Sequence, residues 1–228
     1  MRTVLITGAN RGIGLGLTTH YLKMGVDVVA TYRTQATSEA LLSLCETYEN
    51  LRVRQLDVTD YAAVTRFANQ FEKLDLLINN AGYYGPKGSS FGSIDVEEWR
   101  KVLETNSIAP LKLVEALYPA LQKSTEKRIA ILSSRVGSMT ENTSGGGYIY
   151  RSSKAAVNSV IKSLHNDLNS QNFTVLALHP GWVRTQMGGP NALIEVTESV
   201  QGLVKVIDHS TAEQSGGFFN YDGKHIAW

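Results

Sequence analysis

The chain of 228 residues contains one cysteine, Cys45, and no long apolar run. A lone cysteine excludes an internal disulfide and fits a reducing compartment. No apolar stretch approaches the roughly 20 residues that cross a bilayer, and the N-terminus has no signal-peptide architecture. These absences predict a cytoplasmic protein that has no membrane partner.

The chain also lacks an excess of charge of either sign, because 22 Lys and Arg residues and 21 Asp and Glu residues give a formal net charge of +1. No general field therefore favours nucleic acid, and we expect no nucleic-acid partner. The five histidines are scattered without the spacing of metal ligands, so we expect no metal site. A hydrophobic content of 43% is enough for a sizeable core, and the length fits one domain over 1–228.

The most informative stretch that is present is TVLITGANRGIGLG, residues 3–16. A short apolar run leads to glycines at three fixed positions, and an apolar-periodic segment follows. Strand, glycine loop and helix is the arrangement that holds a nucleotide pyrophosphate on free N–H groups. The alternative is a bare turn between two elements. The residues expected to hold the cofactor here are Gly8, Asn10, Arg11, Gly12, Ile13 and Gly14.

Strand-like and helix-like patterns alternate along the rest of the chain. Further strands are predicted over 26–32, 51–56, 74–78, 128–132, 173–178 and 217–221. Helices are predicted over 38–48, 59–73, 96–104, 107–122, 149–169 and 195–207. Regular alternation predicts an α/β fold with a doubly wound parallel sheet, in which ligands bind beyond the carboxyl ends of the strands.

The second predicted strand ends in ATYRT and has no acidic residue. An NAD site usually has Asp or Glu at this point, to bind the ribose hydroxyls. Arg33 is there instead, and Arg11 lies in the glycine loop. Two guanidinium groups at the 2′ position suit a phosphate, which favours NADP(H) over NAD(H). The alternative is that either arginine is a solvated surface charge.

Other residues that follow strands are candidates for cofactor contacts, with plain turn formation as the alternative for the asparagines. They are Asp57, Val58, Asn79, Asn80, Ala81, Gly82, Pro180, Gly181, Val183 and Thr185.

Residues with acid–base chemistry lie in the second half of the chain. Tyr150 and Lys154 are four residues apart and share a face of a predicted helix. A nearby ammonium lowers the pKa of a phenol, which makes Tyr150 a better acid–base catalyst. Ser133 or Ser134 ends a strand at the same sheet edge, where a hydroxyl can bind a substrate oxygen. Asn106 is expected at a helix start, either holding a water or capping the helix.

In this order, TGANRGIG, NNAG at 79–82, Asn106, the serine pair, YRSSK at 150–154 and PGWVRT at 180–185 resemble the short-chain dehydrogenase/reductase family. The resemblance covers essentially the whole chain. It implies a single-domain Rossmann-type fold with seven mainly parallel strands in the order 3-2-1-4-5-6-7. It also implies a nicotinamide cofactor and a catalytic set of Asn106, Ser134, Tyr150 and Lys154, of which the last two also contact the cofactor.

The resemblance further implies that NADPH reduces a small-molecule carbonyl, that Tyr150 protonates its oxygen and that family members associate as homodimers or homotetramers. The segments SLHNDL, HPGWVRTQMGG and GGFFNYDGKHIAW are similar to those of sniffer-type carbonyl reductases and C-factor-like bacterial proteins. The C-factor likeness leaves open a non-catalytic, dinucleotide-binding signalling protein. Residues 186–210 are expected to form a substrate loop or lid.

Overall fold

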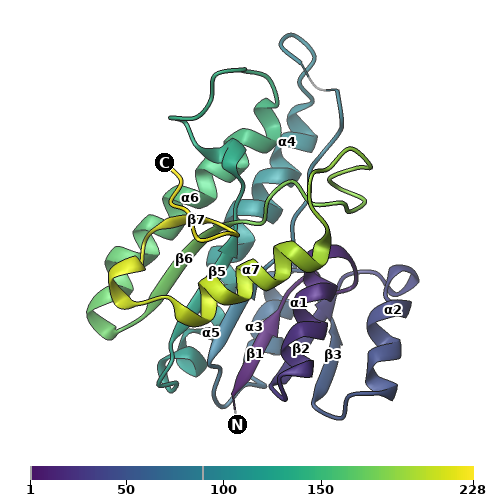
Figure 1. Cartoon of the computed structure of the whole chain (residues 1–228), viewed down its shortest axis with the longest axis vertical. Helices are drawn as coiled ribbons and strands as arrows, with labels where there is room; N and C mark the ends of the chain where they lie inside the picture. The colour runs from purple at the N-terminus through teal and green to yellow at the C-terminus, as the bar shows by residue number, and fades with distance from the viewer. Residues whose placement is uncertain (1, 89) are drawn as a thin grey trace.

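One sheet of seven parallel strands organises the chain, which the computed structural model describes over residues 2–88 and 90–228 (Figure 1). Residues 1 and 89 of the expected domain therefore lie outside the described residues. The strands are β1 (Thr3–Ile6), β2 (Asp27–Tyr32), β3 (Leu51–Gln55), β4 (Leu76–Asn79), β5 (Arg128–Leu132), β6 (Thr174–His179) and β7 (Phe218–Asn220). Their spatial order is β3-β2-β1-β4-β5-β6-β7, which confirms the predicted doubly wound class and strand order.

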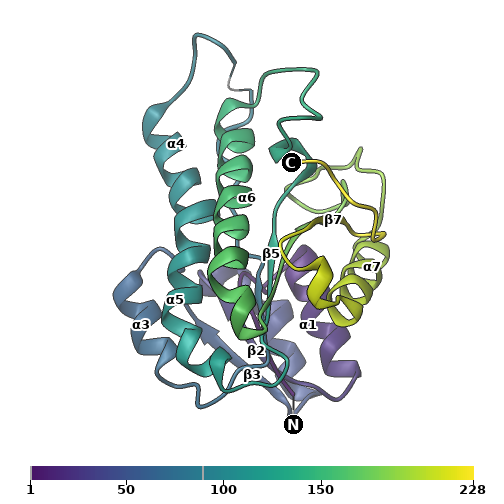
Figure 2. The same ribbon diagram turned by 90° about the vertical axis from the view of Figure 1, so that its left-hand side faces the viewer.

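Helices cover both faces of this sheet (Figure 2). Helices α1 and α7 pack on one face, and α3, α5 and α6 pack on the other. The helices are α1 (Gly12–Lys23), α2 (Glu39–Leu42), α3 (Tyr61–Ala68), α4 (Val96–Leu103), α5 (Ala109–Gln122), α6 (Tyr148–Leu168) and α7 (Val196–His209). Across the described ranges, no helix is both long and apolar enough to cross a membrane.

The central strand β1 shows why the sheet is buried on both faces. Leu5 belongs to the apolar cluster beneath α3, α5 and α6, whereas Val4 and Ile6 belong to the cluster beneath α1 and α7. All three side chains are fully buried. Successive side chains of a strand point to opposite faces, so a strand covered on both sides reads as a continuous apolar run.

Two predicted helices are shorter than the sequence pattern indicated. The segment 38–48 forms the four-residue α2 and then a 3₁₀ turn, Ser43–Glu46. Only Leu41 is buried in these two elements, so tertiary packing adds little, and a helix this short is marginal without it even where its residues favour helix. The predicted helix over 59–73 narrows to α3, which begins after Asp60, whose carboxylate accepts a hydrogen bond from the N–H of Ala63 at 2.9 Å.

The predicted break between helices at 104–107 is absent. A π-helical turn, Glu104–Ile108, joins α4 directly to α5. The expectation that Asn106 starts or caps a helix is therefore wrong, because the residue lies inside a continuous helical run. A π turn inserts one residue into the helical repeat and redirects the side chains within it, which is frequent at functional sites.

The expected substrate segment, 186–210, contains two different structures. Its second part is α7, whose Val200, Leu203 and Ile207 are buried against the sheet. The preceding stretch, 186–195, contains no named helix or strand. Gln186 and Met187 of this irregular stretch lie at the carboxyl ends of the strands, as does Val196, the first residue of α7.

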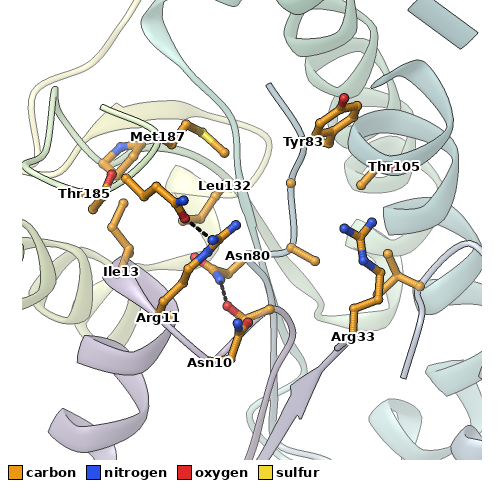
Figure 3. Close-up of a pocket in the computed structure, with 18 of the residues that line it drawn as sticks. Asn10, Arg11, Ile13, Arg33, Asn80, Tyr83, Thr105, Leu132, Thr185 and Met187 are labelled. Atoms are coloured by element: carbon orange, nitrogen blue, oxygen red, sulfur yellow. Dashed lines mark hydrogen bonds between the residues drawn. The ribbon is translucent and has the colours of Figure 1, made fainter. Parts of the chain in front are cut away.

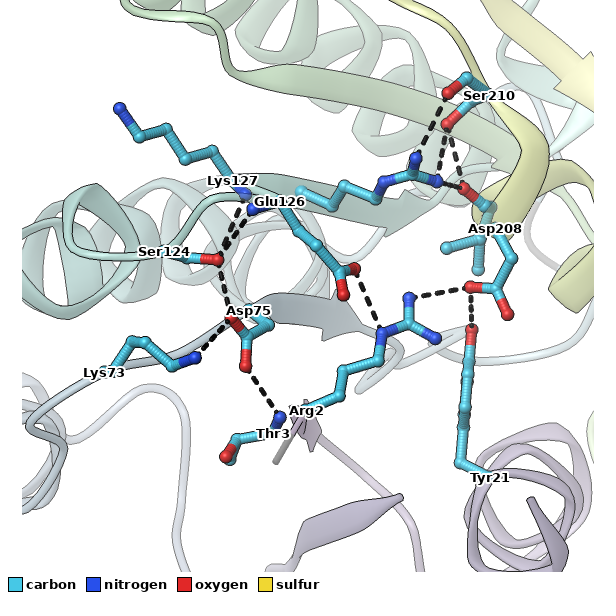
Figure 4. Close-up of polar contacts among 12 residues, drawn as sticks. Arg2, Thr3, Tyr21, Lys73, Asp75, Ser124, Glu126, Lys127, Asp208 and Ser210 are labelled. Atoms are coloured by element: carbon cyan, nitrogen blue, oxygen red, sulfur yellow. Dashed lines mark hydrogen bonds and ion pairs between the residues drawn. The ribbon is translucent and has the colours of Figure 1, made fainter. Parts of the chain in front are cut away.

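Ion pairs and hydrogen bonds tie the elements together at the amino ends of the strands (Figure 4). Arg2 donates to Glu126 at 3.0 Å and to Asp208 at 2.8 Å. The hydroxyl of Tyr21 also donates to Asp208, at 3.1 Å. These contacts join the start of β1 and helix α1 to the end of α7. They lie at the amino ends of the strands, whereas the glycine loop lies at the carboxyl ends.

A buried carboxylate, Asp75, lies beside this network. It accepts hydrogen bonds from the Ser124 hydroxyl at 2.6 Å and from the Thr3 N–H at 2.8 Å, and Lys73 lies 3.2 Å away. Burial alone would raise the pKa of Asp75, but these donors outweigh it and hold the pKa below its ordinary value.

We expect Asp75→Asn to destabilise the fold by about 2 kcal/mol at pH 7, because the substitution removes charge-assisted bonds and leaves a buried donor without a partner. The folded pKa lies below the unfolded value of about 3.9, so the carboxylate's contribution is present above that value and is lost as pH falls through the folded pKa. Urea unfolding at pH 7 and pH 3 measures both effects. The exposed Asp167→Asn is the control, and equal stability of Asp75→Asn and wild type at pH 7 would refute the prediction.

Candidate active site

A cleft of about 520 Å³ opens across the carboxyl ends of the strands (Figure 3). Its walls come from the turn after β1, from the segments that follow β2, β3, β4 and β6, from the end of β5, and from the first turns of α6. Parallel strands place all of these segments at one edge, as the sequence pattern predicted. The predicted residues that line it are Gly8, Asn10, Arg11, Gly12, Ile13, Gly14, Arg33, Asp57, Val58, Asn80, Ala81, Gly82, Ser133, Tyr150, Lys154, Pro180 and Thr185.

At Gly14 the backbone of α1 lies very close to the backbone of the turn after β1 and to the side chain of Asn80. A Cβ at this position would lie 2.4 Å from both the carbonyl oxygen of Gly8 and the amide nitrogen of the Asn80 side chain. Asn80 in turn donates to the carbonyls of Thr7 and Gly8, at 2.8 and 2.9 Å. Asn80 is thus a support for the glycine loop, which explains why a polar residue follows β4.

Helix α1 begins directly at this loop. Its N-cap position is Arg11, and no side chain among the described residues caps the helix. The N–H groups of the first turn therefore face the cleft without a side-chain acceptor. Free N–H groups beside a glycine turn fit the pyrophosphate of a dinucleotide.

Arg11 and Arg33 both line the cleft, Arg11 from the glycine loop and Arg33 from the segment after β2 (Figure 3). Arg11 donates to the side-chain oxygen of Gln186, so it links the glycine loop to the segment after β6. The guanidinium of Arg33 has no hydrogen bond or ion pair within the described part of the chain. Asn10 donates to the main-chain and side-chain oxygens of Thr37, both at 3.0 Å, which fixes the loop against the segment after β2.

Tyr150 and Lys154 lie one helical turn apart in α6, as their spacing predicted. The ammonium of Lys154 is 5.6 Å from the centre of the Tyr150 ring and donates to the carbonyl oxygen of Leu132 at 2.8 Å. Burial lowers the pKa of Lys154 to about 8. The ammonium is thus held beside the phenol by one main-chain acceptor at the end of β5.

The pKa of the Tyr150 phenol differs from the expectation based on the spacing alone. Burial and the neighbouring Tyr84 raise this pKa above its ordinary value, while the hydroxyl of Ser134 lowers it. The expectation that this pKa is lowered is therefore wrong, because desolvation of the phenol dominates. At neutral pH the phenol carries its proton.

The two serines at the end of β5 have different surroundings. The hydroxyl of Ser133 donates to the side-chain oxygen of Asn158 on α6 and is buried. The hydroxyl of Ser134 accepts a long bond, 3.4 Å, from the N–H of Val136 and lowers the pKa of the Tyr150 phenol. Of the two hydroxyls, that of Ser134 is the one that influences the phenol.

The side chain of Asn106 binds the segment that follows β4. Its oxygen accepts from the N–H of Tyr83 at 2.8 Å, and its nitrogen donates to the carbonyl of Tyr83 at 2.8 Å and to Ser153 at 3.0 Å. The amide is thus engaged with protein groups and holds the loop after β4 against α6.

Three residues expected at the cofactor do not line the cleft. Asn79 is buried and donates to the carbonyl of Pro110 at 3.4 Å. Gly181 adopts a φ of +87° and packs against Ile194, and Val183 is buried in the same loop. These three residues pack behind the residues that line the cleft.

The cleft also contains residues that the sequence analysis missed. Thr34, Thr37 and Thr105 line it. No motif marks these threonines, because each lies in a loop, a 3₁₀ turn or a π turn whose course depends on tertiary packing. Gln186, which also lines the cleft, belongs to the expected substrate segment 186–210.

Comparison with known proteins agrees with this geometry. The family model for short chain dehydrogenase matches residues 2–193. The chain therefore belongs to the short-chain dehydrogenase/reductase family, whose members are oxidoreductases that use a nicotinamide dinucleotide.

Within this family the chain is similar to carbonyl reductases of known structure. The carbonyl reductase Sniffer of D. melanogaster is 35% identical, with a TM-score of 0.95 and full coverage of both chains. The NADPH-bound carbonyl reductase from chicken fatty liver is 35% identical, with a TM-score of 0.94 over 100% of this chain and 99% of the other. The C-signal protein of Myxococcus xanthus is 41% identical over 155 residues, which are 68% of this chain and 93% of that protein.

Proposed function

We propose that this protein is an NADPH-dependent carbonyl reductase that converts an aldehyde or ketone into an alcohol. The observation that carries the proposal is the position of the Lys154 ammonium, 5.6 Å from the ring of Tyr150, in the same cleft as the glycine loop. A proton donor beside a dinucleotide site is what carbonyl reduction needs. A protein that only bound the dinucleotide would not require it.

The nicotinamide cofactor, when bound, supplies the hydride that adds to the carbonyl carbon. Tyr150 donates its proton to the carbonyl oxygen, so that C=O becomes CH–OH. Ser134 donates a hydrogen bond to the same oxygen and stabilises the charge that develops on it. Lys154 holds its positive charge next to the phenolate that remains, until solvent returns the proton.

The protonation state of Tyr150 favours reduction over alcohol oxidation. Burial raises the pKa of the phenol, so the proton is in place at neutral pH. A general acid must be protonated at the start of the reaction, whereas alcohol oxidation begins with the phenolate as base.

The rim of the cleft suggests the kind of substrate. Exposed Tyr83 and Met187 line the cleft. Two further exposed aromatic residues are Trp182, which follows β6, and Tyr148, which begins α6 two residues before Tyr150. We infer a carbonyl that has apolar substituents, with the irregular stretch 186–195 as its substrate loop. The proposed association into homodimers or homotetramers rests on the family resemblance.

Preference for NADPH over NADH is assigned to Arg33. Its guanidinium lines the cleft just after β2 and has no partner among residues 2–88 and 90–228, so it is placed to bind a 2′-phosphate. We expect Arg33→Ala to weaken NADPH binding about tenfold or more, because a charge-assisted hydrogen bond is lost. NADH binding should change by less than about twofold, since NADH has no phosphate for this group.

Fluorescence titration of both dinucleotides measures this difference. Arg54→Ala, which removes an exposed arginine of β3, is the matched control. Equal weakening of NADPH and NADH would contradict the assignment of the phosphate to Arg33.

The activity itself is tested by mixing the protein with NADPH and a series of aldehydes, ketones and quinones, and following the absorbance of NADPH. Oxidation of NADPH with a carbonyl supports the proposal. Tight NADPH binding without turnover of any carbonyl would favour the alternative, a dinucleotide-binding signalling protein, to which the similarity to C-signal points.

A further inference from the structure

The ring of Tyr84 packs directly on the ring of Tyr150. Their centroids are 4.6 Å apart and their planes are inclined by 32°. The two residues come from different parts of the chain, one from the segment after β4 and the other from the first turn of α6. Aromatic pairs at this separation attract each other beyond the area they bury.

The backbone before Tyr84 is fixed by the π turn. Asn106 binds both the N–H and the carbonyl of Tyr83, each at 2.8 Å. The hydroxyl of Tyr83 also donates to Glu98 of α4, at 2.7 Å. Three hydrogen bonds therefore hold the residue that precedes Tyr84.

The backbone after Tyr84 is fixed by close packing. Gly85 has a φ of +82°, which disfavours any other residue. A Cβ there would lie 2.9 Å from a methyl group of Val102 and 3.4 Å from one of Ile149, the neighbour of Tyr150. The chain on both sides of Tyr84 is thus anchored to the helices that carry Asn106 and Tyr150.

The stacked ring also changes the surroundings of the phenol. Tyr84 is 38% exposed, so its outer part faces solvent while its ring covers Tyr150. Its proximity contributes to the raised pKa of the Tyr150 phenol, behind burial itself. A covered phenol has fewer orientations and less contact with water than an open one.

We propose that Tyr84 is a positioning residue for Tyr150: its ring, fixed through Tyr83 and Gly85, holds the phenol at the angle from which it protonates the substrate. This inference rests on the proposed reductase function. Because the aromatic ring alone performs this role, a phenylalanine at position 84 should preserve it and an alanine should not. The side chain of Tyr84 has no hydrogen bond within residues 2–88 and 90–228, which fits a role for the ring alone.

The test compares Tyr84→Ala and Tyr84→Phe with wild type, using NADPH and a small aldehyde. We expect alanine to lower kcat about tenfold or more, since displacement of a catalytic group by about 1 Å costs up to a hundredfold. The phenylalanine variant should stay within about twofold of wild type, and both variants should keep the KM for the aldehyde and the Kd for NADPH. Phe91→Ala removes an aromatic ring that is 89% exposed and is the control.

NMR of ring-labelled tyrosine gives a second readout. The Tyr150 signal, assigned with Tyr150→Phe, should move in the alanine variant and not in the phenylalanine variant. An unchanged kcat in Tyr84→Ala, or a higher KM with an unchanged kcat, would overturn the role of Tyr84 while leaving the reductase proposal intact. Absence of NADPH oxidation by the wild-type protein would overturn both.

Discussion

Replacement of Tyr150 by phenylalanine is expected to abolish carbonyl reduction while NADPH still binds. The substitution removes only the hydroxyl, and the ring can keep its contact with Tyr84. General acid catalysis contributes about 10²- to 10⁴-fold, so kcat should fall by at least about a hundredfold. Stopped-flow or steady-state measurement of NADPH absorbance gives kcat, and fluorescence titration gives the Kd of NADPH.

A matched control removes a tyrosine hydroxyl elsewhere. Tyr48 lies near β3, away from the cleft, and Tyr48→Phe should retain wild-type turnover. Turnover of Tyr150→Phe within a few-fold of wild type would show that another group donates the proton.

Replacement of Lys154 by methionine is the second large effect that we expect. The buried ammonium is lost, while an apolar side chain of similar length fills its place. Without the positive charge beside Tyr150, the developing phenolate loses its stabilisation, and kcat should fall about a hundredfold or more. The free energy of unfolding should change little, because removal of a buried charge offsets the loss of its hydrogen bond to the carbonyl of Leu132.

The pH dependence of the wild-type protein follows from the same residue. Burial lowers the pKa of Lys154 to about 8, so the free protein loses the ammonium as pH rises through this value. The value of kcat/KM for NADPH should therefore decline above about pH 8, because this ratio reports the ionisations of the free protein. The exposed Lys162→Met, also on α6, should behave as wild type. A profile that stays flat to pH 9.5 would contradict the requirement for a charged Lys154.

The sequence predicted the sheet and the cofactor side of the cleft well, for a physical reason. Strands buried on both faces read as continuous apolar runs, as in 4–6, and glycine has few substitutes where two backbones meet, as at Gly14. Both signals are local. Because the strands are parallel, the residues that follow them then lie together at the carboxyl ends of the sheet, and no further sequence signal is needed to place them there.

What the sequence did not predict depends on contacts between distant segments. The pattern at 104–107 indicated a break between two helices, whereas packing produces a π turn that directs Asn106 at Tyr83. The pair of Tyr84 and Tyr150 joins two segments separated by more than sixty positions. Neither contact has a signature in either segment alone.

The choice between the two serines shows the same limit. Ser133 and Ser134 are equivalent by sequence, since both end the same strand. In the structure both follow β5, and Ser133 binds Asn158 in the middle of α6, whereas Ser134 lies near the phenol of Tyr150 in the first turn of the same helix. Only the position of α6 against the sheet separates their environments.

The central claim is that hydride passes from NADPH to a carbonyl carbon in this cleft. Incubation with NADPH deuterated at C4 of the nicotinamide on one face or the other, followed by mass spectrometry of the alcohol, tests it most directly. The account predicts one deuterium on the carbinol carbon from one of the two faces only, and at least about a hundredfold less labelled alcohol from Tyr150→Phe in the same time. Alcohol without deuterium from either face, or no alcohol from any carbonyl despite bound NADPH, would contradict it.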